Sequence, residues 1–402
     1  MTPPATATAQ TVSVPLVEHA PLTSLLLNVA HAIDHLVLLI FATAVGAIAA
    51  DFGFARWEDL MPYATGAFVL FGLGAVPAGR LGDQWGRRAM MLVFGVGVGV
   101  SCFVAAAAQN AWQLAAALTL LGAFASIYHP VGIPMLLQHT TRPGAVIGVN
   151  GLVGNLGIAV AAVLTGFLVK YFGWRMAFVV PGLLSLAYAL LFWRVVPRED
   201  APPAKRAARQ SDLPKADLVR AVLVLTVTST CGSLVFNFVT NGNAELMADR
   251  LRAVTPDPAV VGALLGAVYV IASLAQLVVG RAIDRYPFKR LFLFIVVAQI
   301  PLFGLAMYAQ GWVFYVAAIA FMAFVFGAIP FTDALIVRYV DDRMRSRVAG
   351  VRLAIALGVS SLAVWLLGPI VKANGFAFLL GLLAVIAAVS AIAVTRLPQE
   401  RR

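Results

Sequence analysis

The sequence predicts an all-α membrane protein with twelve transmembrane helices in two pseudo-symmetric six-helix bundles. Apolar residues make up 61% of the 402-residue chain and charged residues 12%, against about 45–50% and about 25% in soluble domains. Its apolar runs exceed the roughly 18 residues that mark a membrane-spanning helix, and they lack the alternation of barrel strands. A charged turn at Gly79 also returns, in altered form, at Gly280, half a chain later. Duplicated halves of this kind are typical of secondary transporters.

Twelve apolar runs define the expected helices. They cover about residues 23–48, 62–80, 89–108, 112–137, 145–169, 174–196, 218–244, 259–282, 290–309, 313–338, 347–371 and 374–396. Residues 1–22 contain no Lys or Arg and are expected to be a disordered tail rather than a signal peptide. The proline-rich residues 197–217 are expected to link an N-terminal bundle, 23–196, to a C-terminal bundle, 218–396, and 397–402 form a short tail.

Basic residues gather in the loops on one side of the predicted bundle. Only six of the chain's 29 Lys and Arg residues lie in loops on the other side, namely Arg56, Lys170, Arg175, Arg250, Arg252 and Lys372. Basic loops stay in the cytoplasm, so both termini and the linker are predicted to be cytoplasmic in a bacterial inner membrane. The net charge of +11 lies in connecting turns, which argues against nucleic-acid binding. Cys102 and Cys231 lie in apolar runs and imply no disulfide framework.

The turn between the second and third runs carries the clearest motif. It reads GRLGDQWGRR over residues 79–88, and its later copy keeps Gly280, Asp284 and a closing basic pair. Pro130 in the fourth run has a counterpart in Pro330 of the tenth, and a Val-x-Gly-Val block at 146–149 returns at 348–351. Three blocks in nearly the same register indicate an internal duplication.

With these halves, the linker and the turn motif, the chain resembles the major facilitator superfamily over about residues 23–396. The resemblance implies alternating access, with the turn as a conformational latch that engages the eleventh span. Its residues are Gly79, Asp83, Gly86, Arg87, Arg88, Gly280 and Asp284. A purely topogenic role of the basic turn is the alternative.

A second resemblance concerns the direction of transport. The pair His129-Pro130 is similar to one in the fosmidomycin-resistance-type exporters of bacteria. Drug–proton antiporters of the superfamily carry an arginine four residues before a glycine in the fourth span. The corresponding residue before Gly122 is Leu118, so the chain departs from that group.

The first run contains a polar face. Asn28, His31, Asp34 and His35 fall on one side of a helix, and Asp34 lies about halfway along the run, where an ionised carboxylate costs roughly 2.5–3.5 kcal/mol. Histidine titrates near neutral pH. We therefore predict that Asp34, His31 and His35 couple transport to protons. A static polar patch is the alternative. Two histidines and one carboxylate supply too few ligands for a metal site, so neither a metal nor another cofactor is expected.

The fourth and fifth runs supply substrate-binding candidates. Tyr128 and His129 precede Pro130, which breaks the helix and exposes polar groups to a central cavity; hydrogen bonding to neighbours is the alternative role of His129. In the fifth run, Asn155 is deep enough to face the cavity, whereas Asn150 lies nearer the cytoplasm. The glycines of this run allow close helix contact.

The seventh and eighth runs carry further polar side chains. Asn237, Thr240 and Asn241 share one helix face. The Asn-Gly-Asn string at 241–243 predicts unwinding toward the outer end, with Asn243 and Glu245 on a frayed terminus. In the eighth run, Tyr269, Ser273 and Gln276 form a polar stripe.

Asp333 is the only other acid well inside a run. Arg352, early in the eleventh run, is its nearest candidate counter-charge. We predict that Asp333 is a second proton-coupling residue. Asp333 and Arg352 would pair as a cytoplasmic gate; alternatively, the Arg352 side chain only extends to the membrane interface.

These features predict a proton-coupled secondary transporter that exports a small organic compound. The histidines and Arg352 would suit a compound that is partly anionic. The proposed substrate site comprises Asn28, Tyr128, His129, Asn155, Asn237, Thr240, Asn241, Tyr269, Gln276 and Arg352. Its expected partners are the substrate, protons and the bilayer, around a monomer. Proton-driven import of an organic acid or nutrient is one alternative. A receptor that retains the fold without transport is another. An enzyme is not expected, because no catalytic constellation is evident.

Overall fold

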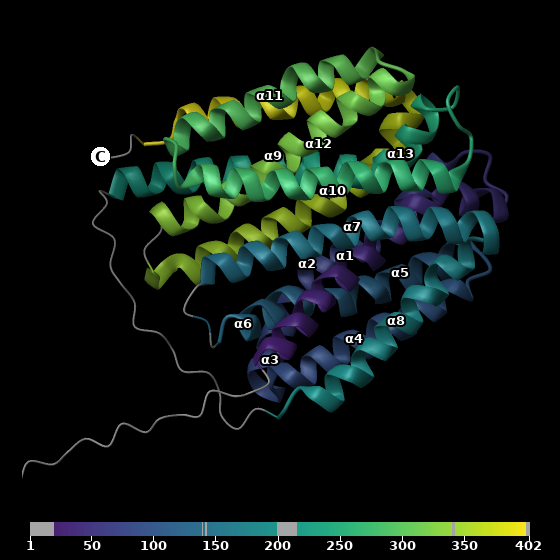
Figure 1. The fold of residues 1–402 in the computed structure, drawn as a ribbon, viewed down its shortest axis with the longest axis horizontal. Coiled ribbons are helices and arrows are strands. Elements are labelled where there is room, and N and C mark those ends of the chain that lie inside the picture. The colour runs from purple at the N-terminus through teal and green to yellow at the C-terminus, as the bar shows by residue number, and fades with distance from the viewer. Residues whose placement is uncertain (1–19, 139, 141–142, 199–214, 340–341, 399–402) are drawn as a thin grey trace, which may run out of the picture.

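The computed structural model describes residues 20–138, 140, 143–198, 215–339 and 342–398, and its elements are helices (Figure 1). The N-terminal half contains α1 Ala20–Asp51, η1 Trp57–Asp59, η2 Met61–Ala64, α2 Thr65–Leu73, α3 Ala75–Trp85, α4 Arg87–Ala106, α5 Ala111–Ala125, η3 Tyr128–Gly132, α6 Ile133–Leu136, α7 Pro143–Phe172 and α8 Trp174–Val195. The C-terminal half contains α9 Lys215–Arg250, α10 Pro258–Ile283, α11 Phe288–Tyr308, α12 Gly311–Tyr339 and α13 Asp342–Thr395.

The predicted apolar runs correspond to these helices. Within the described ranges, ten helices are long and apolar enough to cross a membrane, and Trp57–Leu73 with Ala75–Trp85 forms an eleventh span, bent by 44°. The long α13 contains two spans, because Gly375 leaves the helical path at φ 77° and ψ 174°. A positive φ of this kind is readily adopted only by glycine. The sequence prediction of twelve transmembrane helices is confirmed.

The helices form two bundles joined along two seams. In the first bundle α1 packs on α7, α4 on α8 and α2 on α5; in the second, α9 and α11 pack on α13 and α10 packs on α12. The bundles meet where α7 runs beside α10, in the middle of Figure 1, and where α2 contacts α13. At the α7–α10 seam a Cβ on Gly262 would lie 2.6 Å from the Ala162 carbonyl oxygen. This close approach therefore depends on a residue without a side chain.

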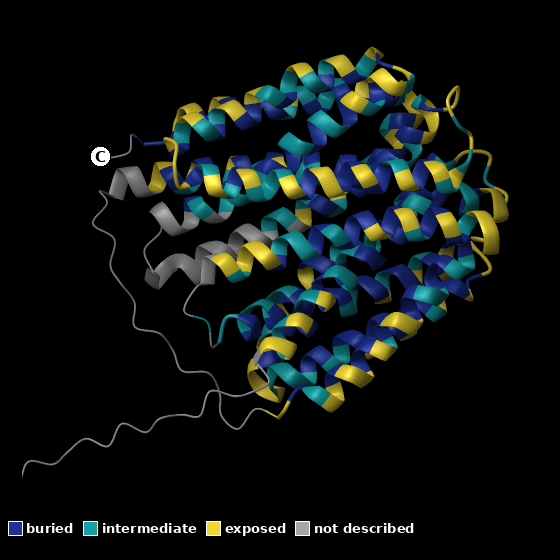
Figure 2. Cartoon of the chain, in the orientation of Figure 1, coloured by how far each residue is buried: buried dark blue, intermediate teal, exposed yellow. Residues whose placement is uncertain are grey.

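Large apolar side chains cover the outward faces of the helices. Val278, for example, is 64% exposed and Phe294 60%, and exposed positions recur along the outer helices in Figure 2. Such surface would be unfavourable in water but suits contact with lipid. Polar residues such as Asp34 and Asn150 lie instead inside the bundles.

Helix breaks follow the sequence in one place and not in another. The break predicted at Pro130 is confirmed, because Tyr128–Gly132 forms a π-helical turn between α5 and α6. The unwinding predicted at 241–243 is wrong, because α9 continues to Arg250. Asn241 Nδ2 donates to the carbonyl of Asn237 at 3.0 Å, so the amide supports the helix rather than competing with it.

Candidate functional site

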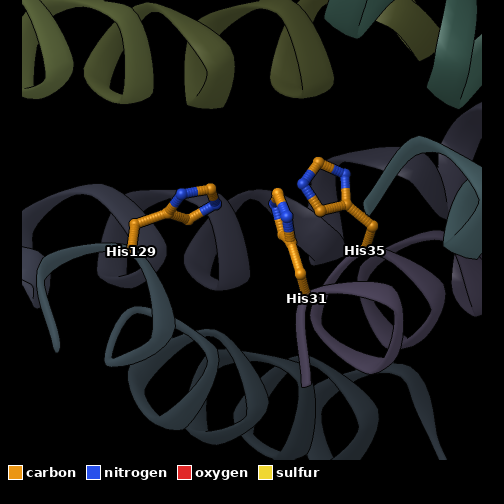
Figure 3. Close-up of side chains that lie close together, drawn as sticks. All are labelled: His31, His35 and His129. Carbon is orange, nitrogen blue, oxygen red and sulfur yellow. The ribbon is translucent and has the colours of Figure 1, made fainter. Parts of the chain in front are cut away.

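Three imidazoles gather inside the N-terminal half. His31 and His35 come from one face of α1, four residues apart, and His129 comes from the π turn η3. Their rings point toward a common space (Figure 3), and one nitrogen of each lies within 4.8 Å of the others. The π turn is what places His129 here, because a π-helical residue is displaced from ordinary helical register.

Asp34 lies beside this cluster and has no exposed surface. His129 Nε2 lies 3.4 Å from Asp34 Oδ2. This separation is longer than a good N–H···O bond, and neither carboxylate oxygen has a well-formed hydrogen bond among the described residues. If Asp34 is ionised, a protonated His129 is the partner that can stabilise its charge. Otherwise Asp34 must itself hold a proton and be neutral.

His31 is held in one orientation. Its Nδ1 lies 2.8 Å from the backbone carbonyl oxygen of Asn150. Because a carbonyl only accepts, this contact assigns the hydrogen to Nδ1 and leaves Nε2 of the neutral ring as a lone-pair acceptor. The ring stacks on Tyr128, with centroids 4.7 Å apart. A Cβ on Gly154 would lie 2.5 Å from its Cε1, so that glycine gives the ring its space.

Asn150 organises this cluster, although sequence reasoning left it out. Its Nδ2 donates to Asn28 Oδ1 at 2.9 Å and to the Tyr128 hydroxyl at 2.7 Å. Asn150 and Gly154 are four residues apart and therefore share a face of α7. That spacing is the sequence signal that would have found it.

Four of the predicted substrate residues of the C-terminal half, Asn237, Thr240, Asn241 and Tyr269, form a separate, internally bonded polar layer. Asn237 Nδ2 donates to Ser360 Oγ at 2.8 Å, and the Tyr269 hydroxyl donates to the Thr240 carbonyl at 3.4 Å. With Asn241, these side chains are buried. The structure therefore brings them together, but not with the histidines.

Asn155 and Gln276 meet across the two halves. Asn155 Nδ2 of α7 donates to Gln276 Oε1 of α10. Both were predicted as substrate residues, and together they form a polar bridge in the apolar α7–α10 seam. Breaking this bond would free one N–H donor of Asn155 and the acceptor oxygen of Gln276 for a bound molecule.

The predicted charged turn contacts the π turn η3, because a Cβ on Gly79 would lie 3.3 Å from Pro130 Cβ. Its residues are helical in α3 as far as Trp85, and Gly86, with φ 90°, separates α3 from α4. Arg88 donates to the carbonyls of Val196 and Trp193, at 2.5 and 2.6 Å, and so anchors the turn to the end of α8.

The partner predicted for the latch lies in the eleventh span. Asp83 and Asp284 are exposed at the ends of α3 and α10, and a Cβ on Gly280 would meet open space. The side chains of 336–354 lie outside the described residues, as do those of Asp333 and Arg352. The latch and the predicted cytoplasmic gate therefore stay predictions. Most of the linker and both tails fall outside the described ranges too.

Ion pairs join the halves at the end of the bundle remote from the start of α1. Lys170, at the end of α7, pairs with Asp257, and Lys372 Nζ lies 2.5 Å from Asp59 Oδ1. The hydrogen bond from Lys170 lowers the pKa of the Asp257 carboxyl below its usual range. Trp57 stacks on Phe376 at the same end.

Glu245 also contacts the opposite half. A Cβ on Gly46 would lie 2.8 Å from Glu245 Oε1. The expectation that Glu245 and Asn243 sit on a frayed helix end is wrong, because both lie within the continuous α9.

The sequence matches the family profile described as Major Facilitator Superfamily over residues 27–250. It is 32% identical over 134 residues to the puromycin resistance protein pur8 of Streptomyces alboniger, covering 33% of this chain and 26% of that protein. It is 32% identical over 174 residues to the multidrug efflux pump LfrA of Mycolicibacterium smegmatis, covering 42% and 34%. A longer match, 25% identical over 292 residues, covers 63% of this chain and 64% of the 4-hydroxybenzoate transporter PcaK of Pseudomonas aeruginosa. The chain thus spans about a quarter to a third of the first two relatives.

Solved structures share the fold along nearly the whole chain. The xylose transporter XylE from E. coli, in an inward open conformation, superposes with a TM-score of 0.75 at 13% identity, covering 95% of this chain and 97% of that one. A bacterial homolog of the human lysosomal transporter Spinster, inward-facing and unoccupied, gives 0.69 at 16% identity, covering 94% and 95%.

Proposed function

The chain belongs to the major facilitator superfamily, and on that premise we propose that it is a proton-coupled secondary transporter that exports a small organic compound. In this proposal two bundles, residues 23–196 and 218–396, rock about a central substrate site in a bacterial inner membrane, with both termini in the cytoplasm. Members of the superfamily are transporters rather than enzymes.

The observation that carries the proposal is the Asp34–His129 contact. Asp34 is fully buried, and His129 Nε2 at 3.4 Å is the one ion-pair partner recorded for it in the described part of the chain. A proton on Asp34 neutralises the carboxylate and removes its attraction for a protonated His129. Loss of that proton restores the attraction. The pair therefore gives α1 and the π turn two arrangements that differ by one proton.

The position of His129 supports coupling to movement of the protein. His129 lies on the π turn of the fourth span, and Gly79 of the charged turn packs against the next residue, Pro130. A shift of His129 would therefore displace Pro130 and, through it, the residues of the predicted latch. Packed elements transmit such shifts because they have discrete arrangements.

The interhalf ion pairs support one particular conformation. Lys170–Asp257 and Lys372–Asp59 join the halves at the end opposite the start of α1. With the termini cytoplasmic, as the basic loops predict, this end faces outward and the pairs close the outer side. The structure would then be an inward-open state, and both pairs would break when the outer side opens.

Export of a small organic compound fits the names of two relatives, a puromycin resistance protein and a multidrug efflux pump. Imidazoles and amides suit a partly anionic compound, since each can donate hydrogen bonds to a carboxylate. Proton-driven import of an aromatic acid is the second candidate. It is favoured by the longer match to the 4-hydroxybenzoate transporter, which covers 64% of that protein.

The test measures proton movement in vesicles that contain the purified protein and a trapped pH-sensitive dye. 4-Hydroxybenzoate and puromycin are added in turn under an imposed pH gradient. We expect at least one compound to drive proton flux, and Asp34→Asn to abolish it while the protein still folds. Asp249→Asn, the same change at an exposed acid at the end of α9, is the matched control and keeps the flux. Full flux in Asp34→Asn would refute the proposed coupling, and so would the absence of compound-dependent flux.

A further inference from the structure

We propose that His31, His35 and His129 form a binding site for a divalent transition-metal ion such as Zn²⁺ or Co²⁺. Binding at this site requires neither transport nor a proton gradient, so the inference goes beyond the proposed function. The sequence alone predicts no metal site, because the first span offers only two histidines and one carboxylate. The fold adds a third imidazole from the fourth span.

The spacing of the three imidazoles suits an ion of this size. Their ligand nitrogens lie within 4.8 Å of one another, and the rings converge in Figure 3. In a tetrahedral zinc site with Zn–N distances of about 2.0–2.1 Å, two ligand nitrogens lie about 3.4 Å apart. Binding would therefore draw the nitrogens closer together than the 4.8 Å limit within which they lie here.

Two of the nitrogens are buried and unsatisfied. Nε2 of His31 and Nε2 of His35 have no solvent exposure and no hydrogen-bond partner among the described residues. Buried polar atoms of this kind are uncommon and call for a ligand, a water molecule or a proton. A metal ion would satisfy both at once.

The surroundings of His31 and His129 match those of metal ligands. A histidine that binds a metal through one nitrogen usually donates the other N–H to a carbonyl or carboxylate. His31 already makes this bond, from Nδ1 to the Asn150 carbonyl at 2.8 Å, which leaves Nε2 facing the cluster. Asp34, 3.4 Å from His129, places a carboxyl group beside the site. In its ionised form that group would offset the cost of a cation within a membrane-spanning bundle.

The bundle also explains what occupancy would do. The ligands come from α1 and from the π turn η3, so a bound ion would tie the first span to the fourth. It would also occupy the lone pairs that otherwise accept protons. We therefore expect the ion to inhibit proton-coupled transport of any substrate.

The experiment titrates Co²⁺ into the purified full-length protein, prepared without a polyhistidine tag, and records the visible absorption of four-coordinate Co²⁺. Zn²⁺ displacement of Co²⁺ then gives the zinc affinity. We expect one ion per protein, and a loss of affinity on the order of tenfold to 100-fold or more in His35→Asn and His129→Asn. Cys102→Ser with Cys231→Ser is the matched control and keeps both stoichiometry and affinity.

Folding is checked separately, by the thermal midpoint of each metal-free variant. In addition, Zn²⁺ is expected to raise the midpoint of the unaltered protein but not that of His129→Asn. Absence of stoichiometric binding would overturn the inference, as would unchanged binding in both histidine variants. The proposed proton coupling is tested independently, with chelator present, through Asp34→Asn. Either proposal can therefore fail without the other.

Discussion

His129 Nε2 lies 3.4 Å from Oδ2 of Asp34, a carboxylate with no exposed surface. The two residues are 95 positions apart and come from the first and fourth spans. Because Asp34 makes no well-formed hydrogen bond within the described residues, this imidazole is the one group recorded there that can pair with its carboxylate. A single proton therefore changes the interaction between two helices, which is the property that a coupling site requires.

Replacing His129 should separate hydrogen bonding from proton transfer. His129→Gln keeps a donor for Asp34 but cannot carry a charge. We expect the variant to insert and fold, while pH-driven transport falls to the background of empty vesicles. Phe71→Leu, which alters the ring packed 5.8 Å from His129, is the control for packing alone and retains transport. Normal proton flux in His129→Gln would remove this histidine from the coupling mechanism.

Asn150→Ala should destabilise the N-terminal half. The change removes the donor for Asn28 Oδ1 and for the Tyr128 hydroxyl, and an unsatisfied buried polar group costs about 1–3 kcal/mol. The backbone carbonyl that holds His31 remains, so the imidazole cluster should persist. The measurement is thermal unfolding in detergent. Gln109→Ala, at an exposed loop residue, is the control and should leave the midpoint unchanged.

Sequence patterns anticipated the elements more fully than the site. The spacing of His31, Asp34 and His35 predicts that they share one face of the first helix. Such a prediction needs only the regular period of an α-helix and no knowledge of tertiary packing. The break before Pro130 was also foreseeable, since proline lacks the backbone donor that a helix needs. That the resulting turn is π-helical, and brings His129 to Asp34, depends on packing between distant spans. The contacts of Asn150 also depend on packing between distant spans. Its position along the helix suggested a place near the cytoplasm, but the helix face on which it lies is what brings it to the histidines.

The predicted unwinding of the seventh span is an error of another kind, because a local sequence signal predicted a feature that the structure lacks there. Asn and Gly favour turns in isolation, but Gly242 packs close to the Leu367 side chain, and Asn243 lies 3.5 Å from the Tyr269 hydroxyl. Tertiary contacts therefore outweighed local preference. Dipeptide signals of this kind are weak inside long apolar runs.

Two glycines of α7 should respond differently to the same substitution. A Cβ on Gly157 would lie 2.2 Å from the carbonyl oxygen of Ala32, whereas nothing lies within 4 Å of a Cβ on Gly148. Gly157→Ala must push α1 away from α7, and overpacking of this kind costs typically about 1–3 kcal/mol. Gly148→Ala should be neutral or stabilising by up to about 1 kcal/mol, because alanine favours the helix.

The thermal unfolding midpoints of the two alanine variants, measured under the same condition, test this difference in stability. We expect Gly157→Ala to unfold at a lower temperature than Gly148→Ala and to lose transport, because α1 carries the histidines. Equal midpoints would mean that the α1–α7 contact is looser than the structure shows.

The Lys170–Asp257 pair should make the contact between the ends of α7 and α10 depend on pH. The hydrogen bond from Lys170 lowers the pKa of Asp257, so in the paired state this carboxyl stays ionised at pH values where a free one begins to protonate. Its stabilising effect is fully present above the usual carboxyl pKa. It is lost as the pH falls through the lowered value. Acidification should therefore favour separation of the two helix ends.

Spin labels near Lys170 on α7 and near Asp257 on α10 would report that separation across an acid titration. Asp257 also accepts a hydrogen bond from the Ala259 amide at 2.9 Å and so caps α10. Asp257→Asn keeps a capping oxygen but removes the charge, and it should abolish the pH dependence of the label distance without unwinding the helix. Lys170→Gln removes the other partner and should have the same effect. Because both groups are partly exposed, added salt should weaken the pair as well. A distance distribution that responds to acid equally in the unaltered protein and in both variants would show that another group controls closure.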